Sequence, residues 1–134
     1  LTDEEWVLIR KHPSVGANII QPLGFMKREQ FIIRHHHERM DGKGYPDGLT
    51  GNQLDDLTKI IIVVDSYDAM TSKRNYRQNM TTEQAVEELF RCSGTQFEPT
   101  IVDYFARNIT NYIPVKNVFP NENLENVLQK NQKH

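Results

Sequence analysis

The feature that most constrains the fold of this chain is a long segment, residues 55–72, that neither Gly nor Pro interrupts. It contains five consecutive β-branched residues, Ile60 to Val64, which by propensity are typical of a buried parallel strand. Nothing nearby supplies the other strands of a sheet, however, and the segment continues from Asp65 to Met70 without a turn. We therefore predict one helix that is hydrophobic nearly all round, and hence central in a bundle.

Capping signals predict further helices around this central one. Thr2 with Glu5, and Thr81 with Gln84, have the spacing of a capping box, in which two side chains satisfy free backbone N–H groups. Pro13 is expected to end the first helix and to start the next one, because proline is tolerated in a first turn. The predicted helices cover residues 2–11, 13–21, 27–38, 55–72, 81–92, 98–112 and a short stretch over 123–130. The predicted fold class is all-α.

Length, charge and cysteine content limit the classes of protein to which this chain can belong. A chain of 134 residues suits one domain, and a net charge of −2 gives no sign of the strongly basic face that binding of a nucleic-acid polymer normally requires. The longest aliphatic run, Ile60 to Val64, is too short to span a bilayer, and the single cysteine, Cys92, fits a reducing cytoplasm. We expect a helical domain over residues 1–113 and a polar extension over 114–134. Because the first residue is Leu and not Met, we also expect a piece of a longer protein.

Imidazole and carboxylate groups cluster in the run His35-His36-His37-Glu38, followed by Asp41. These groups are the usual ligands of divalent first-row metal ions. Adjacent helical residues project about 100° apart, so two of the three histidines can address one metal centre or two neighbouring ions. The third histidine must then point elsewhere. A solvated patch explains one histidine well, but it does not explain three beside two carboxylates.

A glycine-rich loop follows the histidines. Gly42, Gly44, Gly48 and Gly51 permit unusual backbone angles, whereas Pro46 fixes its own. A connection with this much turn chemistry is a shaped loop, where site residues tend to collect. A plain connection between two helices would explain the glycines and leave the histidines unexplained.

Residues 36–51 match the motif HHE-x-x-DG-x-GYP-x-GL-x-G, and the chain thereby resembles the HD-GYP family. Members of that family are metal-dependent phosphohydrolases that cleave the bacterial second messenger cyclic di-GMP. Residues 64–77 are similar to the family's VAD-x-x-DALTS-x-R-x-YR segment, and the resemblance runs from about residue 1 to 105. It implies an HD-superfamily helical bundle. The His-Asp doublet of the family name occurs nowhere in this sequence, so we expect a bundle that is incomplete on its N-terminal side.

The resemblance also implies a set of metal ligands. His36 and His37 lie in the motif, Asp65 lies in the downstream segment, and His12 with Gly16 matches an H-P-x-x-G setting of the family. From the residues alone, His12 reads as an ordinary helix-end histidine, and Asp65, which we expect to be buried, also fits a salt bridge inside the bundle. Iron or manganese is the expected metal, and zinc is compatible with the same ligands.

Other residues are assigned roles by the resemblance. Arg74 and Arg77 would hold the phosphates of cyclic di-GMP, because guanidinium groups pair bidentately with phosphate. Without the resemblance, such a basic cluster is more often a solvated face. Asp68, one helical turn after Asp65, would orient a ligand or a water. The residues expected to shape the loop, and to offer a contact to a protein partner, are Gly44, Tyr45 and Pro46.

Two functions remain open at this point. The first is a metal-dependent phosphodiesterase that hydrolyses cyclic di-GMP. Four ligands hold about one ion, because closed sites need about four and catalytic sites keep one position open. We therefore expect weak or no turnover from this chain alone. The alternative is a non-catalytic module that binds a cyclic dinucleotide or a protein partner, and a His-Asp doublet upstream in the gene would favour the enzyme.

Overall fold

The computed structural model describes residues 2–72 and 78–109. Its helices are α1 (Asp3–Ile20), α2 (Lys27–His35), α3 (Asp56–Thr71), α4 (Thr82–Arg91) and α5 (Pro99–Ile109), with the short 3-10 helices η1 (Gln21–Leu23) and η2 (Gly51–Gln53). The described residues contain isolated bridges but no strand, so the all-α prediction is confirmed. Arg74, Arg77, the helix expected over 123–130 and the extension over 114–134 lie outside the described residues.

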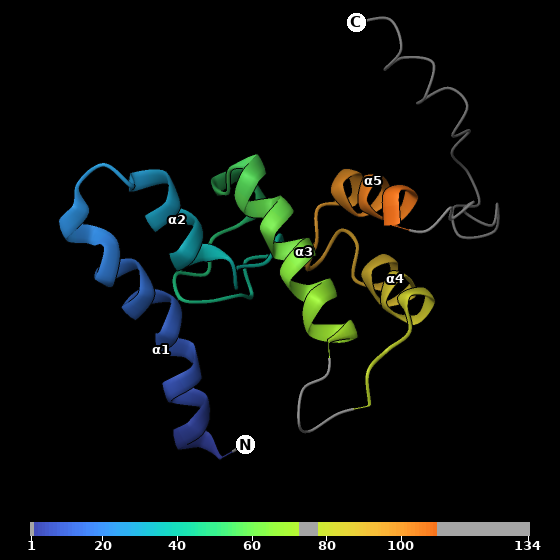
Figure 1. Ribbon diagram of the computed structural model, residues 1–134, viewed down its shortest axis with the longest axis horizontal. Coiled ribbons are helices and arrows are strands. Elements are labelled where there is room, and N and C mark those ends of the chain that lie inside the picture. The colour runs from blue at the N-terminus through green and yellow to red at the C-terminus, as the bar shows by residue number, and fades with distance from the viewer. Residues whose placement is uncertain (1, 73–77, 110–134) are drawn as a thin grey trace, which may run out of the picture.

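The helices are arranged around α3, as Figure 1 shows. α1 and α2 form a hairpin on one side of it, and α4 and α5 lie on the other side. α3 packs against α2, α4 and α5, so the long apolar segment is the central helix that its sequence predicted. Asp55 caps its first turn, with a carboxylate oxygen that accepts from the backbone N–H of Thr58 at 2.8 Å.

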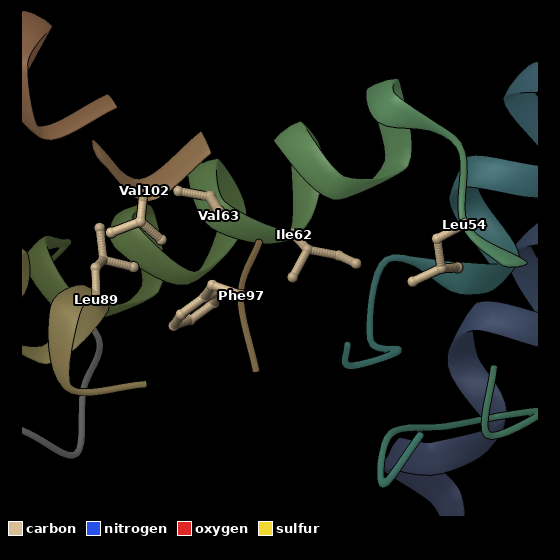
Figure 2. Packing of buried hydrophobic residues seen from close by; sticks show 6 residues of the cluster. All are labelled: Leu54, Ile62, Val63, Leu89, Phe97 and Val102. Carbon is tan, nitrogen blue, oxygen red and sulfur yellow. The ribbon is translucent and has the colours of Figure 1, made fainter. Parts of the chain in front are cut away.

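The hydrophobic core lies between α3 and the two C-terminal helices. Figure 2 shows its buried members, with Leu54 at one end, Leu89 at the other and Ile62 between them. Burying an aliphatic side chain of this size stabilises the fold by about 1.5–3 kcal/mol. α3 is not buried all round, however, because Ile60 and Val64 are 42% and 40% exposed. The six core residues are Leu54, Ile62, Val63, Leu89, Phe97 and Val102.

α1 differs from its prediction. It is a single helix with Pro13 inside it, and the prediction of two helices that meet at Pro13 is wrong. Proline has no N–H to donate to the carbonyl four residues earlier, which here belongs to Ile9. The side chain of His12 donates to that carbonyl instead, through its ring atom Nδ1. The helix therefore continues past a buried proline without a free acceptor at Ile9.

α2 is shorter than predicted. It ends at His35, and His36 occupies its C-cap, whereas the sequence had suggested a helix to Glu38. The side chain of Glu38 is only 1% exposed, because the chain turns it inward toward the glycine-rich loop. His36 and His37 therefore lie just beyond the helix end, where the free carbonyl groups give a partial negative charge that favours cations.

Candidate metal centre

The close contact between α1 and α2 brings His12 to the other histidines. Gly16 lies at this contact, where a Cβ atom would come within 3.0 Å of Cγ2 of Ile33. Ala17, one residue further, is buried. Small residues at these two positions let the helix backbones approach, and His12 lies one turn before Gly16 on the same helix. The H-P-x-x-G pattern thus has a packing role as well as a chemical one.

Three imidazole rings meet at this contact. His12, His36 and His37 each offer one nitrogen, and these nitrogens all lie within 4.8 Å of one another. Nε2 of His12 is 3.0 Å from Nε2 of His37. The ring centroids of His36 and His37 are 4.1 Å apart, and that of His12 is 5.8 Å from His36. His36 and His37 lie just beyond the end of α2, and His12 lies in the middle of α1.

Backbone carbonyl groups orient two of these rings. Nδ1 of His12 contacts the carbonyl of Ile9, and Nδ1 of His36 lies 2.7 Å from the carbonyl of Ile33. A carbonyl oxygen can only accept, so Nδ1 carries the proton in both rings. The lone pair of each ring is then on Nε2. A hydrogen bond at the far nitrogen is the usual way in which a protein orients a metal-binding histidine.

The third ring is uncharged at neutral pH. Burial, and then the neighbouring rings of His36 and His12, lower the pKa of His37 to about 4, while Asp65 acts in the opposite direction. Because the proton of His12 is on Nδ1, its Nε2 accepts and Nε2 of His37 donates across their 3.0 Å contact. A metal cation between these nitrogens would take the place of that proton, since neutral imidazole is the form that binds metals.

The donor set fits a divalent metal ion. Two nitrogen ligands of one first-row ion, each about 2.0–2.1 Å from it, lie about 3.0–3.4 Å apart. The two Nε2 atoms of His12 and His37 are at the lower end of this spacing. Three imidazole ligands would also leave room for a further ligand and for a substrate. This chemistry is common to iron, manganese and zinc sites.

The structure places the two aspartates outside this triad. Asp65 is half-buried in α3, which corrects the expectation of burial, and it makes no ion pair with any described residue. Its charge is nevertheless felt at both His37 and Tyr45. Asp68 is exposed, and its carboxylate accepts from the hydroxyl of Ser72 at 2.8 Å. The roles expected of Asp65 as a ligand and of Asp68 as an orienting group stay predictions.

A second cluster, made of His35, Glu38 and Asp47, also brings potential ligand atoms within 4.8 Å. Its oxygens are already engaged. The carboxylate of Glu38 accepts from two backbone N–H groups, and that of Asp47 pairs with Arg34 at 2.8 and 2.9 Å. These contacts tie the end of α2 to the loop, so we assign the cluster a structural role. The sequence analysis counted Glu38 in the cluster of potential ligand groups, left it out of the ligand set, and did not foresee its contacts with the loop.

The loop motif contacts the triad through Tyr45. Its ring stacks on the imidazole of His37, with centroids 5.0 Å apart and planes 12° apart, and the guanidinium of Arg10 lies over its ring at 5.7 Å. The peptide bond between Tyr45 and Pro46 is cis. Burial raises the pKa of the Tyr45 phenol above its usual value. The sequence carried no signal for Arg10, which resembles any exposed helical arginine.

The fold and the triad define the class as all-α domains with a cluster of imidazoles that could hold a metal ion. The family model of the HD domain matches residues 1–101, and the chain belongs to this family. This confirms the resemblance that the motif indicated. No helix in the described residues is both long enough and apolar enough to cross a membrane.

Several curated proteins are similar to this chain. It is 32% identical over 122 residues to 3'3'-cGAMP-specific phosphodiesterase 2 of Vibrio cholerae, covering 90% of this chain and 23% of the relative. It is 35% identical over 109 residues to the cyclic di-GMP phosphodiesterase response regulator RpfG of Xanthomonas campestris, covering 80% and 29%. A cyclic di-GMP phosphodiesterase of Thermotoga maritima is 35% identical over 111 residues, with 80% and 30% covered. The chain thus spans less than a third of the length of these relatives.

Proposed function

We propose that this chain forms part of a metal-dependent phosphodiesterase centre that hydrolyses cyclic di-GMP. The observation that carries the proposal is the convergence of His12, His36 and His37, whose ligand nitrogens lie within 4.8 Å of one another. The relatives support the choice of substrate, because RpfG and the Thermotoga maritima protein are named for cyclic di-GMP and the Vibrio cholerae protein for 3'3'-cGAMP. All three act on cyclic dinucleotides.

The residues of this chain have distinct tasks in such a reaction. His12, His36 and His37 hold a divalent ion, iron or manganese in our proposal, with Asp65 as the further ligand from α3. A bound metal supplies a water of lowered pKa and shields the negative charge that develops on the phosphoryl group. The carbonyls of Ile9 and Ile33 keep two rings in the tautomer that offers Nε2.

The substrate has its own proposed contacts. Arg74 and Arg77, outside the described residues, pair with the phosphates, since a guanidinium group makes two parallel hydrogen bonds to one phosphate. Tyr45 and Pro46 belong to the loop that closes one face of the triad, and a protein partner would contact this loop from outside. Cyclic di-GMP is an intracellular messenger, so the proposed place of action is the bacterial cytoplasm.

The test begins with metal loading. The purified chain is loaded anaerobically with Fe(II) or Mn(II), and its products from cyclic di-GMP and from 3'3'-cGAMP are separated by chromatography. We expect slow, metal-dependent release of linear product, because the described residues hold only part of a catalytic ligand set. His37→Ala should abolish it. Glu88→Gln, at an exposed ion pair with Arg91, is the matched control and should leave it unchanged.

Two results would contradict the proposal in different ways. A wild-type chain that binds neither metal under any loading condition has no metal centre. A chain that binds metal and cyclic di-GMP but releases no product is instead the non-catalytic nucleotide-binding module. Faster turnover of 3'3'-cGAMP than of cyclic di-GMP would keep the reaction and change the substrate.

A further inference from the structure

We propose that Glu38 is a positioning residue for the metal centre, which it serves by holding the glycine-rich loop against His37. The loop is defined here as residues 42–50. Its contacts fix both the backbone and the imidazole of His37, so the carboxylate of Glu38 controls a metal ligand that it does not touch itself. The inference rests on the proposed function only where it assigns a metal to His37.

The carboxylate of Glu38 is buried and is hydrogen-bonded to the loop. Its side chain is 1% exposed, and a buried carboxylate is unfavourable unless hydrogen bonds satisfy it. Both oxygens are satisfied by the loop: Oε1 accepts from the backbone N–H of Asp47 at 2.7 Å, and Oε2 from that of Leu49 at 3.0 Å. Charge-assisted hydrogen bonds of this kind are about twice as strong as neutral ones. The loop is therefore attached at two points to one side chain.

Neighbouring groups reinforce the attachment. Nδ1 of His35 lies 3.4 Å from Oε1 of Glu38 and 3.5 Å from a carboxylate oxygen of Asp47. Arg34 pairs with the same Asp47 carboxylate through two nitrogens. The end of α2 thus binds the loop through three side chains, those of Arg34, His35 and Glu38. This explains why the third histidine of the run points away from the triad.

The backbone of the loop is in direct contact with the backbone of His37. A Cβ atom on Gly44 would lie 2.5 Å from Cα of Glu38 and 2.6 Å from the carbonyl oxygen of His37. Only glycine allows this approach, because real Cβ atoms do not come that close to backbone. The next residue, Tyr45, donates its backbone N–H to the same carbonyl at 3.2 Å. The loop backbone therefore lies directly on the peptide of the proposed ligand.

The loop also holds the imidazole ring of His37. The ring of Tyr45 stacks on that of His37 and covers one of its faces, which restricts the rotation of the His37 side chain while the loop stays in place. Metal sites require ligands that are held by their surroundings within about half an ångström of the productive geometry. His12 and His36 have carbonyl groups that hold them. For His37 the stacked Tyr45 ring and the backbone contact have this role.

The experiment measures Co(II) binding by the 134-residue chain through the visible absorption of the bound ion. Glu38→Gln keeps the shape but replaces one acceptor oxygen with an NH₂ group, which faces a backbone N–H that it cannot satisfy. We expect at least tenfold weaker Co(II) binding and an altered absorption spectrum. Gly44→Ala leaves Glu38 intact but lifts the loop, so it should give the same change. Glu88→Gln is the same substitution at an exposed ion pair and should bind as the wild type does.

A second measurement is independent of any metal. In nuclear magnetic resonance spectra of the metal-free chain, the stacked Tyr45 ring should shift the ring protons of His37 upfield. Both loop variants should remove that shift and expose the amides of Asp47 and Leu49 to hydrogen exchange. If Glu38→Gln or Gly44→Ala keeps the shift and the Co(II) affinity, the inference is wrong. If the wild type binds no Co(II) but shows the shift, the metal proposal fails and the loop's hold on His37 stands.

Discussion

Nε2 of His12 lies 3.0 Å from Nε2 of His37, although 25 positions separate the two residues in the chain. Two unprotonated nitrogens would repel each other at this distance, so the contact requires a proton or a cation between them. The contact exists because α1 packs closely on α2 and because His37 is held in place beyond the end of α2.

Metal binding should depend on His36 and His37 more than on His35. The first two rings meet His12, whereas His35 is buried against Glu38 and Asp47. Elemental analysis of His36→Ala, His37→Ala and His35→Ala proteins after loading with Mn(II) measures the difference. We expect the first two to lose most of their metal and the third to keep more. Equal loss in all three would contradict the assignment.

Asp65→Asn should lower the metal content and leave the fold largely intact. The amide keeps the shape of the side chain and one carbonyl acceptor, but it removes the charge that attracts a cation. Asp65 has no ion-pair partner among the described residues. The free energy of unfolding of the protein should therefore change by less than about 1 kcal/mol, as is usual for partly exposed sites. Metal analysis and thermal unfolding together test this. Normal metal content with early melting would identify a structural aspartate.

Gly16→Val should weaken metal binding from a distance. The new side chain meets Ile33, against which even a Cβ atom would be only 3.0 Å away, and should push α1 and thus His12 away from α2. Overpacking of this kind costs about 1–3 kcal/mol of stability. The double variant Gly16→Val with Ile33→Ala provides the control, because it restores space at the contact. Co(II) affinity should fall in the single variant and partly recover in the double one.

Nucleotide affinity should fall when Arg74 and Arg77 are both replaced by Ala, with metal content unchanged. A hydrogen bond to a charged group contributes about 1.5–3 kcal/mol, so the loss of two should weaken binding at least tenfold. Calorimetry with cyclic di-GMP measures the effect. Replacing Arg91, which pairs with Glu88 on α4, serves as a control for general loss of positive charge. An unaltered affinity would mean that both arginines belong to a solvated face and do not bind the nucleotide.

The N-cap of α3 should make the fold sensitive to acid. Hydrogen bonding from Thr58 lowers the pKa of the Asp55 carboxyl. Because the folded value is the lower one, the stabilisation is fully present above about pH 4 and is lost as the pH falls through the folded pKa. Asp55→Ala should therefore cost about 1 kcal/mol at pH 7 and less at pH 3. Urea unfolding at both pH values checks this, with Asp55→Asn, an uncharged cap, as the comparison.

The helices were predictable where their signals are local. The capping boxes of Thr2 and Thr81 mark the beginnings of α1 and α4, and the uninterrupted apolar segment became α3. The errors arose where a side chain replaced a backbone partner. His12 satisfies the carbonyl that Pro13 leaves free, and Glu38 turns inward to the loop, so α1 continues and α2 stops early. Neither event can be read from propensity, because both depend on where a side chain finds its partner.

By itself, the sequence determined the all-α class, the metal-binding chemistry and the family, because periodicity, caps and a long motif are properties of neighbouring residues. Only the tertiary structure decided which groups meet. It placed His12 against His36 and His37, and left Asp65 and Asp68 outside that triad. It also turned the carboxylate of Glu38 toward the loop, where it accepts hydrogen bonds. The physical reason is that the geometry of the three imidazoles depends on how closely α1 approaches α2. That distance is set by packing at Gly16 and Ile33, residues with no metal chemistry of their own.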